Sequence, residues 1–282
     1  MKVSVCVITF QQEAFIEQAV RSALDQVTDF EFEVIVGDDA SRDGTADILR
    51  QLQTEYPTRL RLLLAEQNYG DYGLSNLMGV LDAATGDYIA LLDGDDFWTD
   101  PSKLQAQADF LDAHPDCTIC AHRSKHLLAD EDTLLSPRPI NGDGILPIAK
   151  LVTNNFAEKA ATMVRRDAVQ KLPDWYRTTK AVSCDWVFNV LIGAQSGKIG
   201  YIDKVMSVHR FHQGSVSVHH GTDGLLADKL KSLDLVAPHL PDAAKSAVSR
   251  ARWIVRLKRA ALKISPNAYL GAKKLGGRRP SA

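Results

Sequence analysis

Cysteine is scarce in this chain, which has four cysteines among 282 residues. Small secreted domains that depend on disulfides are much richer in cysteine, so we expect these thiols to stay reduced. Cys117 and Cys120 form a CxxC pair, but an offset of three in a strand points them to opposite faces, and no second pair is present. The cysteines therefore predict neither a disulfide scaffold nor a zinc site.

Long hydrophobic runs are also missing, since no apolar stretch approaches the roughly 20 residues that a bilayer-spanning helix needs. The first apolar run, residues 3–8, is too short for a cleavable signal. The chain contains no repeat of fixed period and no segment of low complexity. Its 45% hydrophobic content is ample for a packed core, so we expect a folded, cytoplasmic protein.

Acidic residues are absent after residue 242, although eleven lysine and arginine residues follow that point. The preceding part holds all 35 acidic residues, so the near-neutral net charge of −2 hides two regions of opposite sign. The basic segment is therefore a separate electrostatic module, and we expect its partner to be anionic.

Apolar residues recur at helical spacing within this basic segment and predict an amphipathic helix over residues 245–264. Two partners suit such a helix equally well. One is an anionic membrane, with the protein peripheral at the inner face of the plasma membrane; the other is a protein surface, on this domain or in a homodimer. A nucleic-acid partner is not expected, because no recognised module accompanies the charge. The predicted apolar stripe consists of Trp253, Ile254, Leu257, Ala261 and Ile264.

Short apolar runs alternate with helical patterns over the first hundred residues. Four such runs, at residues 3–8, 32–36, 60–64 and 88–92, predict strands. The alternation predicts an α/β fold with a doubly wound, mainly parallel sheet and helices on both faces. The first helical pattern would bury Ile16, Ala19, Val20, Ala23 and Leu24.

The pattern is looser beyond residue 101. It predicts helices over 102–114 and 184–196, strands near 118–122, 160–164 and 198–202, and a Pro- and Gly-rich mobile loop over 129–147. We expect one catalytic domain over 1–220, divided into a nucleotide-sugar half (1–100) and an acceptor half (101–220). A basic helical extension with a disordered end would follow over 221–282.

Four residues, Asp93-Gly94-Asp95-Asp96, follow the fourth predicted strand. Ligands of open α/β sheets bind at the carboxyl ends of strands, where clustered carboxylates need a cation. An EF-hand loop is excluded, because Trp98 and Leu104 stand where it needs glycine and glutamate. A metal site for a phosphorylated substrate and a solvated acidic turn without function both remain open from these residues alone.

Five segments extend this pattern along the chain: VSVCVITF, EVIVGDDASRDGT, GDYIALLDGDDFWTDPSKL, CDW and VHRFHQGSVS. In this order and spacing, over residues 2–217, they resemble the family-2 glycosyltransferases of GT-A fold. The resemblance implies inverting transfer of a sugar from a nucleotide diphosphate sugar, with UDP expected, and Mn²⁺ or Mg²⁺ as cofactor. It also implies a glycan or lipid-linked acceptor in bacterial cell-surface polysaccharide synthesis, such as that of lipopolysaccharide.

The resemblance assigns the nucleotide-sugar site to the ends of the first two strands. Thr9 and Phe10 would line the base and ribose, although Phe10 could equally be a buried aromatic at a strand end. Asp38 would accept the imide N–H of uracil, as it could that of thymine or guanine. Asp39 is expected to cap the turn over residues 41–44.

The resemblance also assigns the reacting centre. Asp93 would contact ribose or metal, Asp95 and His212 would hold the metal, and Asp96 would support them. Asp185 would be the base that takes the proton of the acceptor hydroxyl, although an aspartate there is also an ordinary helix N-cap. Many relatives have Glu-Asp or Gly-Asp where this chain has Cys184-Asp185, so the chain departs from the family pattern at the residue before the expected base.

Two other classes of protein are alternatives to a glycosyltransferase. A sugar nucleotidylyltransferase would open with a Gly-rich basic phosphate loop, which residues 9–15 lack. A catalytically inactive nucleotide-sugar-binding or assembly subunit is the stronger alternative, because related folds lose catalysis while they keep binding. The joint presence of the acids and His212 favours the enzyme. No basic residue near 74–76 is available to contact a phosphate.

Overall fold

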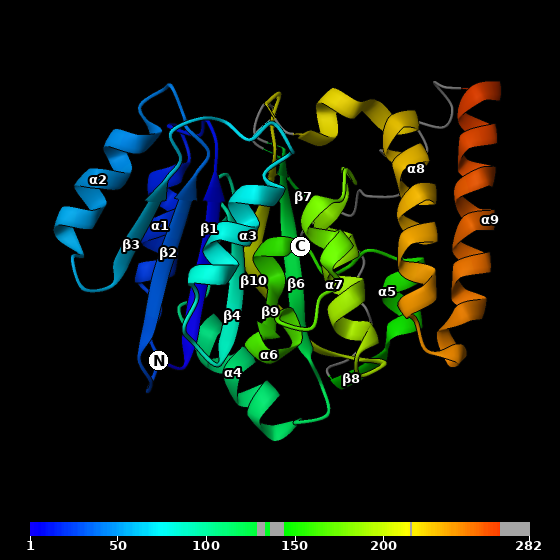
Figure 1. Cartoon of the computed structure of the whole chain (residues 1–282), viewed down its shortest axis with the longest axis horizontal. Helices are drawn as coiled ribbons and strands as arrows, with labels where there is room; N and C mark the ends of the chain where they lie inside the picture. Colours follow the sequence, from blue (N-terminus) through cyan, green and yellow to red (C-terminus); the bar gives the residue numbers. More distant parts are fainter. Residues whose placement is uncertain (129–132, 136–143, 215, 266–282) are drawn as a thin grey trace.

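The computed structural model describes residues 1–128, 133–135, 144–214 and 216–265 (Figure 1). The strands of the first half are all parallel neighbours. They are β1 (Val3–Thr9), β2 (Phe32–Asp38), β3 (Leu60–Leu64) and β4 (Tyr88–Asp93). This half of the sheet confirms the predicted alternation of strands and helices.

The second half of the sheet is mixed. It contains β5 (Phe97–Trp98), β6 (Ile119–Leu128), β7 (Thr133–Leu135), β8 (Gly144–Pro147), β9 (Thr162–Arg165) and β10 (Lys198–Phe211). The order is β3-β2-β1-β4-β9-β6-β10-β5, with β7 beside β6 and β8 beside β10. Because β9 is antiparallel to both β4 and β6, the strands β1–β4, β6 and β10 all run in one direction. The sheet is therefore mainly parallel.

Helices cover both faces of the sheet, as the sequence predicts. Alternate residues of β1 join two different apolar clusters: Val3, Val5 and Val7 face one, Cys6 and Ile8 the other. The first cluster includes α1 (Ile16–Leu24), α2 (Thr45–Glu55) and α4 (Lys103–Ala113). The second includes α3 (Leu74–Ala83), α5 (Ile148–Thr153), α6 (Arg166–Val169) and α7 (Cys184–Ala194).

Two strands lie where a continuous loop was predicted over residues 129–147. β7 extends the edge of β6, and β8 pairs with β10, so the loop prediction is wrong for these segments. The remainder of that predicted loop lies outside the described residues. β10 is also much longer than predicted and continues to Phe211, which brings the following residues to the carboxyl end of the sheet.

The C-terminal helices α8 (Val216–Val236) and α9 (Asp242–Ile264) pack against the same side as α7, as Figure 1 shows. Gly221 interrupts α8 with φ of 61°.

The extension is helical, as predicted, but α9 does not bury the predicted stripe of Trp253 and its neighbours. The division near residue 220 stays a prediction, and the end expected to be disordered lies outside the described residues. The buried face of α9 consists of Ala244, Ala247, Val248, Ala251 and Val255.

None of the described helices combines the length and the apolarity that a membrane crossing requires.

Lys103, at the start of α4, is fully buried. Its Nζ lies 3.7 Å from the centre of the Trp98 ring and has no hydrogen-bond partner among the described residues. Burial lowers the pKa of this ammonium well below its usual range, because the charged form loses its hydration. The fold therefore carries an unpaired basic group in its core.

We expect the Lys103→Met variant to raise the free energy of unfolding at pH 7 by about 1–4 kcal/mol, because methionine fills similar space without a buried charge. The pKa of Lys103 is lower in the folded state, so the unfolded state binds more protons below its own pKa of about 10.4. Wild-type stability contributed by this group therefore rises with pH up to that value. In urea unfolding, the advantage of the variant should shrink towards that pH; a constant advantage would contradict the prediction.

Candidate active site

The carboxyl ends of three parallel strands meet at one edge of the sheet. In the β1–β2 pairing Thr9 lies beside Asp38, and in the β1–β4 pairing Ile8 lies beside Asp93. The strand order reverses between β1 and β4, since β2 and β3 lie on one side of β1 and β4 on the other. Open α/β sheets bind their ligands at such a switch point.

A cleft of about 600 Å³ opens beside the ends of β1 and β2, a volume typical of small-molecule sites. Phe10, Asp38 and Ser41 are among its lining residues. Phe10 is 41% exposed, so the alternative of a buried aromatic is wrong. Thr9, in contrast, is buried, and its hydroxyl donates a hydrogen bond of 2.8 Å to Gln12.

The turn cap predicted for Asp39 is made by its neighbour Asp38, the last residue of β2. Asp38 accepts hydrogen bonds from the backbone N–H and the hydroxyl of Ser41, at 3.1 and 2.5 Å. Asp39 instead accepts from Asn68 Nδ2 and from the Tyr69 N–H, both at 2.9 Å. The predicted cap by Asp39 is therefore wrong: Asp38 caps the turn, and Asp39 holds the loop after β3.

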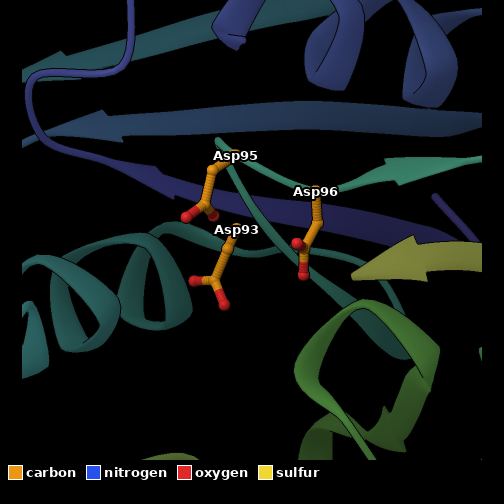
Figure 2. Close-up of side chains that lie close together, drawn as sticks. All are labelled: Asp93, Asp95 and Asp96. Atoms are coloured by element: carbon orange, nitrogen blue, oxygen red, sulfur yellow. The ribbon is translucent and has the colours of Figure 1, made fainter. Parts of the chain in front are cut away.

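Figure 2 shows the side chains of Asp93, the last residue of β4, and of Asp95 and Asp96 in the short loop before β5. Each offers a carboxylate oxygen within 4.8 Å of the others. Gly94 allows this loop to lie against the end of β1, because a Cβ there would stand 2.8 Å from the Cβ of Thr9. The acids that the sequence singled out thus converge on one point.

Asp93 forms an ion pair with Lys159, whose Nζ lies 2.6 Å from Oδ1. Burial and the neighbouring charges of Asp95 and Asp96 outweigh this ion pair and raise the pKa of Asp93 to about 6. Lys159 begins the 3₁₀ turn η1 (Lys159–Ala161). Burial disfavours the charged form of Lys159, but the interactions with Asp93, Cys184 and Asp185 outweigh it and raise the pKa of Lys159 above its usual value.

Sequence reasoning did not identify Lys159, because a lysine just before a strand has no distinguishing local pattern. Only the packing of η1 against β4 brings it to the acidic loop. It places a cation beside the acidic loop, whereas the sequence has none near residues 74–76.

His212 follows β10 and reaches Asp95, with 3.0 Å between Nε2 and Oδ2. Burial opposes ionisation of Asp95, but the hydrogen bond with His212 and the charge of His209 together lower its pKa. Arg210 donates a hydrogen bond of 2.6 Å to the carbonyl oxygen of Asp95. The end of β10 therefore fixes the acidic loop through both a side chain and the backbone.

Asp96 is almost completely buried and accepts a hydrogen bond of 2.9 Å from the Arg210 N–H. Its Oδ2 lies 3.0 Å from His209 Nδ1. Burial disfavours the charged imidazole of His209, but the carboxylate of Asp96 outweighs it and raises the pKa of His209 to about 10. These contacts agree with the supporting role predicted for Asp96.

Asp185 is the second residue of α7, and Ser183 occupies the N-cap position. The alternative of an ordinary N-cap is therefore wrong. Within the described ranges no group donates a hydrogen bond to the Asp185 carboxylate. The ammonium group of Lys159, which is hydrogen-bonded to Asp93, also interacts electrostatically with Asp185. Asp228 of α8 fixes the preceding loop by accepting from the Val182 and Ser183 N–H groups, at 3.0 and 2.9 Å.

The donor set suits a hard divalent cation such as Mn²⁺ or Mg²⁺, because it offers carboxylate oxygens and one imidazole nitrogen. Burial raises the pKa values of Asp93 and Asp96, as expected where several carboxylates share a confined space. Asp95 and His212 lie close enough to act together, and Asp93 is adjacent. All the predicted site residues thus lie along one edge of the sheet; their individual roles remain predictions.

Comparison with known proteins agrees with this geometry. The family model for glycosyl transferase family 2 matches residues 4–173. An uncharacterized protein of Mycobacterium tuberculosis is 32% identical over 265 residues, covering 90% of this chain and 74% of that protein.

Two shorter matches are to named enzymes. A putative teichuronic acid biosynthesis glycosyltransferase of Bacillus subtilis is 38% identical over 109 residues, 39% of this chain and 41% of that protein. The Campylobacter jejuni GalNAc(5)-diNAcBac-PP-undecaprenol beta-1,3-glucosyltransferase is 38% identical over 96 residues, 34% of this chain and 30% of that protein.

Solved structures share the fold at low sequence identity. TarS of S. aureus in complex with UDP-GlcNAc superposes with a TM-score of 0.68 at 20% identity, covering 95% of this chain and 75% of that one. The mannosyltransferase PcManGT of Pyrobaculum calidifontis, in complex with GDP-Man and Mn²⁺, also has a TM-score of 0.68, at 17% identity over 99% of this chain and 76% of that one. The chain therefore belongs to glycosyl transferase family 2 and has the GT-A fold.

Proposed function

We propose that this protein transfers a sugar from a nucleotide diphosphate sugar, with UDP as the expected nucleotide, to a hydroxyl group of a glycan or lipid-linked acceptor. The product would belong to bacterial cell-surface polysaccharide. One observation carries the proposal: the cleft beside Phe10, the acidic loop over residues 93–96 and Asp185 all lie at one switch point of the sheet, with Lys159 between the acids.

The cleft suits the nucleotide. The exposed ring of Phe10 offers a face on which a base can stack, and Asp38 offers carboxylate oxygens to a ring N–H. Solved complexes of the two structural neighbours hold UDP-GlcNAc and GDP-Man, which supports a nucleotide-sugar site in this fold. A uracil N–H is the partner we assign to Asp38.

The acidic loop suits the diphosphate and the sugar. Asp95 and His212 would hold Mn²⁺ or Mg²⁺, and Asp93 would contact the ribose or the same ion. When bound, the cation would neutralise charge that grows on the leaving diphosphate. Lys159 already stands in the site with its ammonium group 2.6 Å from Asp93, and we assign it to the same developing charge.

Asp185 would accept the proton of the acceptor hydroxyl while the oxygen bonds to the anomeric carbon and the bond to the diphosphate breaks. Its carboxylate has no hydrogen-bond donor in the part of the chain that the structure describes, so it is available to a substrate hydroxyl. One displacement from the opposite face inverts the anomeric configuration. The oxocarbenium character of such a transition state makes sugar positioning as important as the base.

A lipid-linked acceptor is the finer part of the proposal. The glucosyltransferase of Campylobacter jejuni acts, by its name, on a glycan linked to undecaprenol, and the Bacillus subtilis relative is named for teichuronic acid biosynthesis. The first name supports a lipid-linked acceptor and the second a cell-surface polysaccharide; we place the protein at the inner face of the plasma membrane, where such a lipid would be reached.

The test is hydrolysis of a panel of nucleotide sugars in the presence of Mn²⁺, with released nucleotide diphosphate as the readout. We expect slow turnover of one donor, faster when cell-glycan acceptors are added. Binding of a donor without turnover, even with acceptors, would assign the protein to the inactive subunits. Failure of every donor to bind would contradict the nucleotide-sugar site itself.

We expect the Phe10→Leu variant to weaken nucleotide binding by about five- to 150-fold, because stacking on an aromatic face contributes about 1–3 kcal/mol per base. The Phe10→Tyr variant keeps the ring and should bind within about twofold of wild type. Isothermal titration with the nucleotide diphosphate measures both variants. Equal affinity of Phe10→Leu and wild type would remove Phe10 from the site.

A further inference from the structure

The outward face of α9 carries three large apolar side chains that the fold leaves uncovered. Trp253, Leu257 and Ile264 are 63%, 49% and 85% exposed. Trp253 stands two residues from both Ala251 and Val255, which are buried against the domain. At about 100° per residue this places Trp253 opposite the buried face. The helix is therefore apolar on two sides, and only one side is covered.

The basic residues of α9 divide between the same two sides. Arg252 pairs with Asp234 and Arg259 with Asp223, so these charges are neutralised by α8. Arg250 and Arg256 lie three residues before and after Trp253, which makes them its neighbours on the outward face. Neither arginine has an acidic partner within the described ranges.

The position of α9 in the molecule connects its outward face with the candidate active site. In Figure 1, α9 is the outermost element on its side of the domain, and its C-terminal end points towards the same end of the molecule as the carboxyl ends of β1, β2 and β4. α9 packs on α8, and Asp228 of α8 holds the loop before Asp185. A surface that holds α9 would thus also orient the acceptor side of the site.

We propose that this outward face of α9, formed by Trp253, Leu257, Ile264, Arg250 and Arg256, docks on a bilayer of anionic phospholipid. The apolar side chains enter the boundary between headgroups and acyl chains, and the two arginines contact the headgroup phosphates. Docking would bring the active site to the membrane that holds a lipid-linked acceptor, and in this respect the inference rests on the proposed function.

The positive charge of the outward face of α9 favours an anionic bilayer over a second copy of this chain as its partner. A twofold dimer through this face would set the arginines of one copy near those of the other, with no acid on α9 after Asp242 to separate them. An anionic bilayer matches both the apolar row and its flanking charges.

The test is sedimentation of the full chain with vesicles, without any donor. Vesicles of phosphatidylglycerol and phosphatidylcholine in equal parts are compared with vesicles of phosphatidylcholine alone. We expect binding to the anionic vesicles, and a loss of about thirtyfold in the Arg250→Gln/Arg256→Gln variant, because each basic residue near the surface contributes about fivefold. The Trp253→Ala/Leu257→Ala variant should lose about tenfold or more. The matched control Lys171→Gln/Lys180→Gln, which changes exposed lysines elsewhere, should bind within about twofold of wild type.

Several results would overturn the inference: no binding by wild type, equal binding to neutral vesicles, or equal loss in the control. A dimer detected by analytical ultracentrifugation without lipid, and dissociated by Trp253→Ala/Leu257→Ala, would assign the face to a second copy. Donor hydrolysis in solution is measured in parallel and should be unchanged in these variants. If the protein hydrolyses a donor but does not bind vesicles, only the docking is contradicted. If it binds anionic vesicles but hydrolyses no donor, only the proposed function is contradicted.

Discussion

The Asp185→Asn variant is expected to lower kcat for sugar transfer by about 10²- to 10⁴-fold, because asparagine keeps the size of the side chain but cannot take the acceptor proton. Donor affinity should change little, since the role we propose for Asp185 is towards the acceptor hydroxyl and its carboxylate makes no hydrogen bond within the described ranges. Single-turnover transfer with a saturating donor measures the rate, and titration with the nucleotide diphosphate measures binding separately.

Asp174→Asn is the matched control for this variant. Asp174 is an exposed carboxylate that precedes α7 by about ten residues, and its replacement should leave both rate and affinity near wild type. An Asp185→Asn rate within about fivefold of wild type would be too small a loss for a general base, and would move that role to another group.

The Asp95→Asn variant is expected to lose about 10²- to 10³-fold in kcat with Mn²⁺, as is typical when one electrostatic contact of a reacting centre is removed. The reason is that Asp95 and His212 are the oxygen and nitrogen donors that stand together at the centre of the site. Metal binding gives a readout independent of turnover: the dependence of nucleotide binding on Mn²⁺ should disappear.

Asp109→Asn in α4 is the control, because it removes an exposed carboxylate that does not belong to the acidic loop. It should keep the Mn²⁺ dependence. If Asp95→Asn also kept it and Asp93→Asn lost it, the metal would belong to Asp93. Comparing the two variants therefore separates the two carboxylates as well as testing the site.

Local patterns were sufficient for the first half of the fold. The five apolar residues predicted to line the first helix are the residues that α1 buries. Three of the four predicted strand runs extend by one or two residues in the structure, and the run over residues 60–64 coincides with β3. Prediction succeeded here because each helix and strand must bury a periodic apolar face against a close neighbour in the sequence.

Local patterns failed in the segment that carries β7 and β8. β7 and β8 lie in a Pro- and Gly-rich segment, and only their pairing with β6 and β10 makes them strands. The stripe of Trp253 and its neighbours was as periodic as the face of alanines and valines that α9 buries. Periodicity says that a helix has an apolar side, but it does not say which of two sides meets the protein.

The sequence by itself determined the family, the strand ends that carry acids and the set of candidate site residues, because motif order and spacing are properties of the chain alone. The tertiary structure decided what surrounds these residues. It brought Lys159 to Asp93, engaged Asp39 with Asn68 and Tyr69 rather than with the turn, and left Trp253 in solvent. These outcomes depend on contacts between residues far apart in the chain, and no local spacing encodes such contacts.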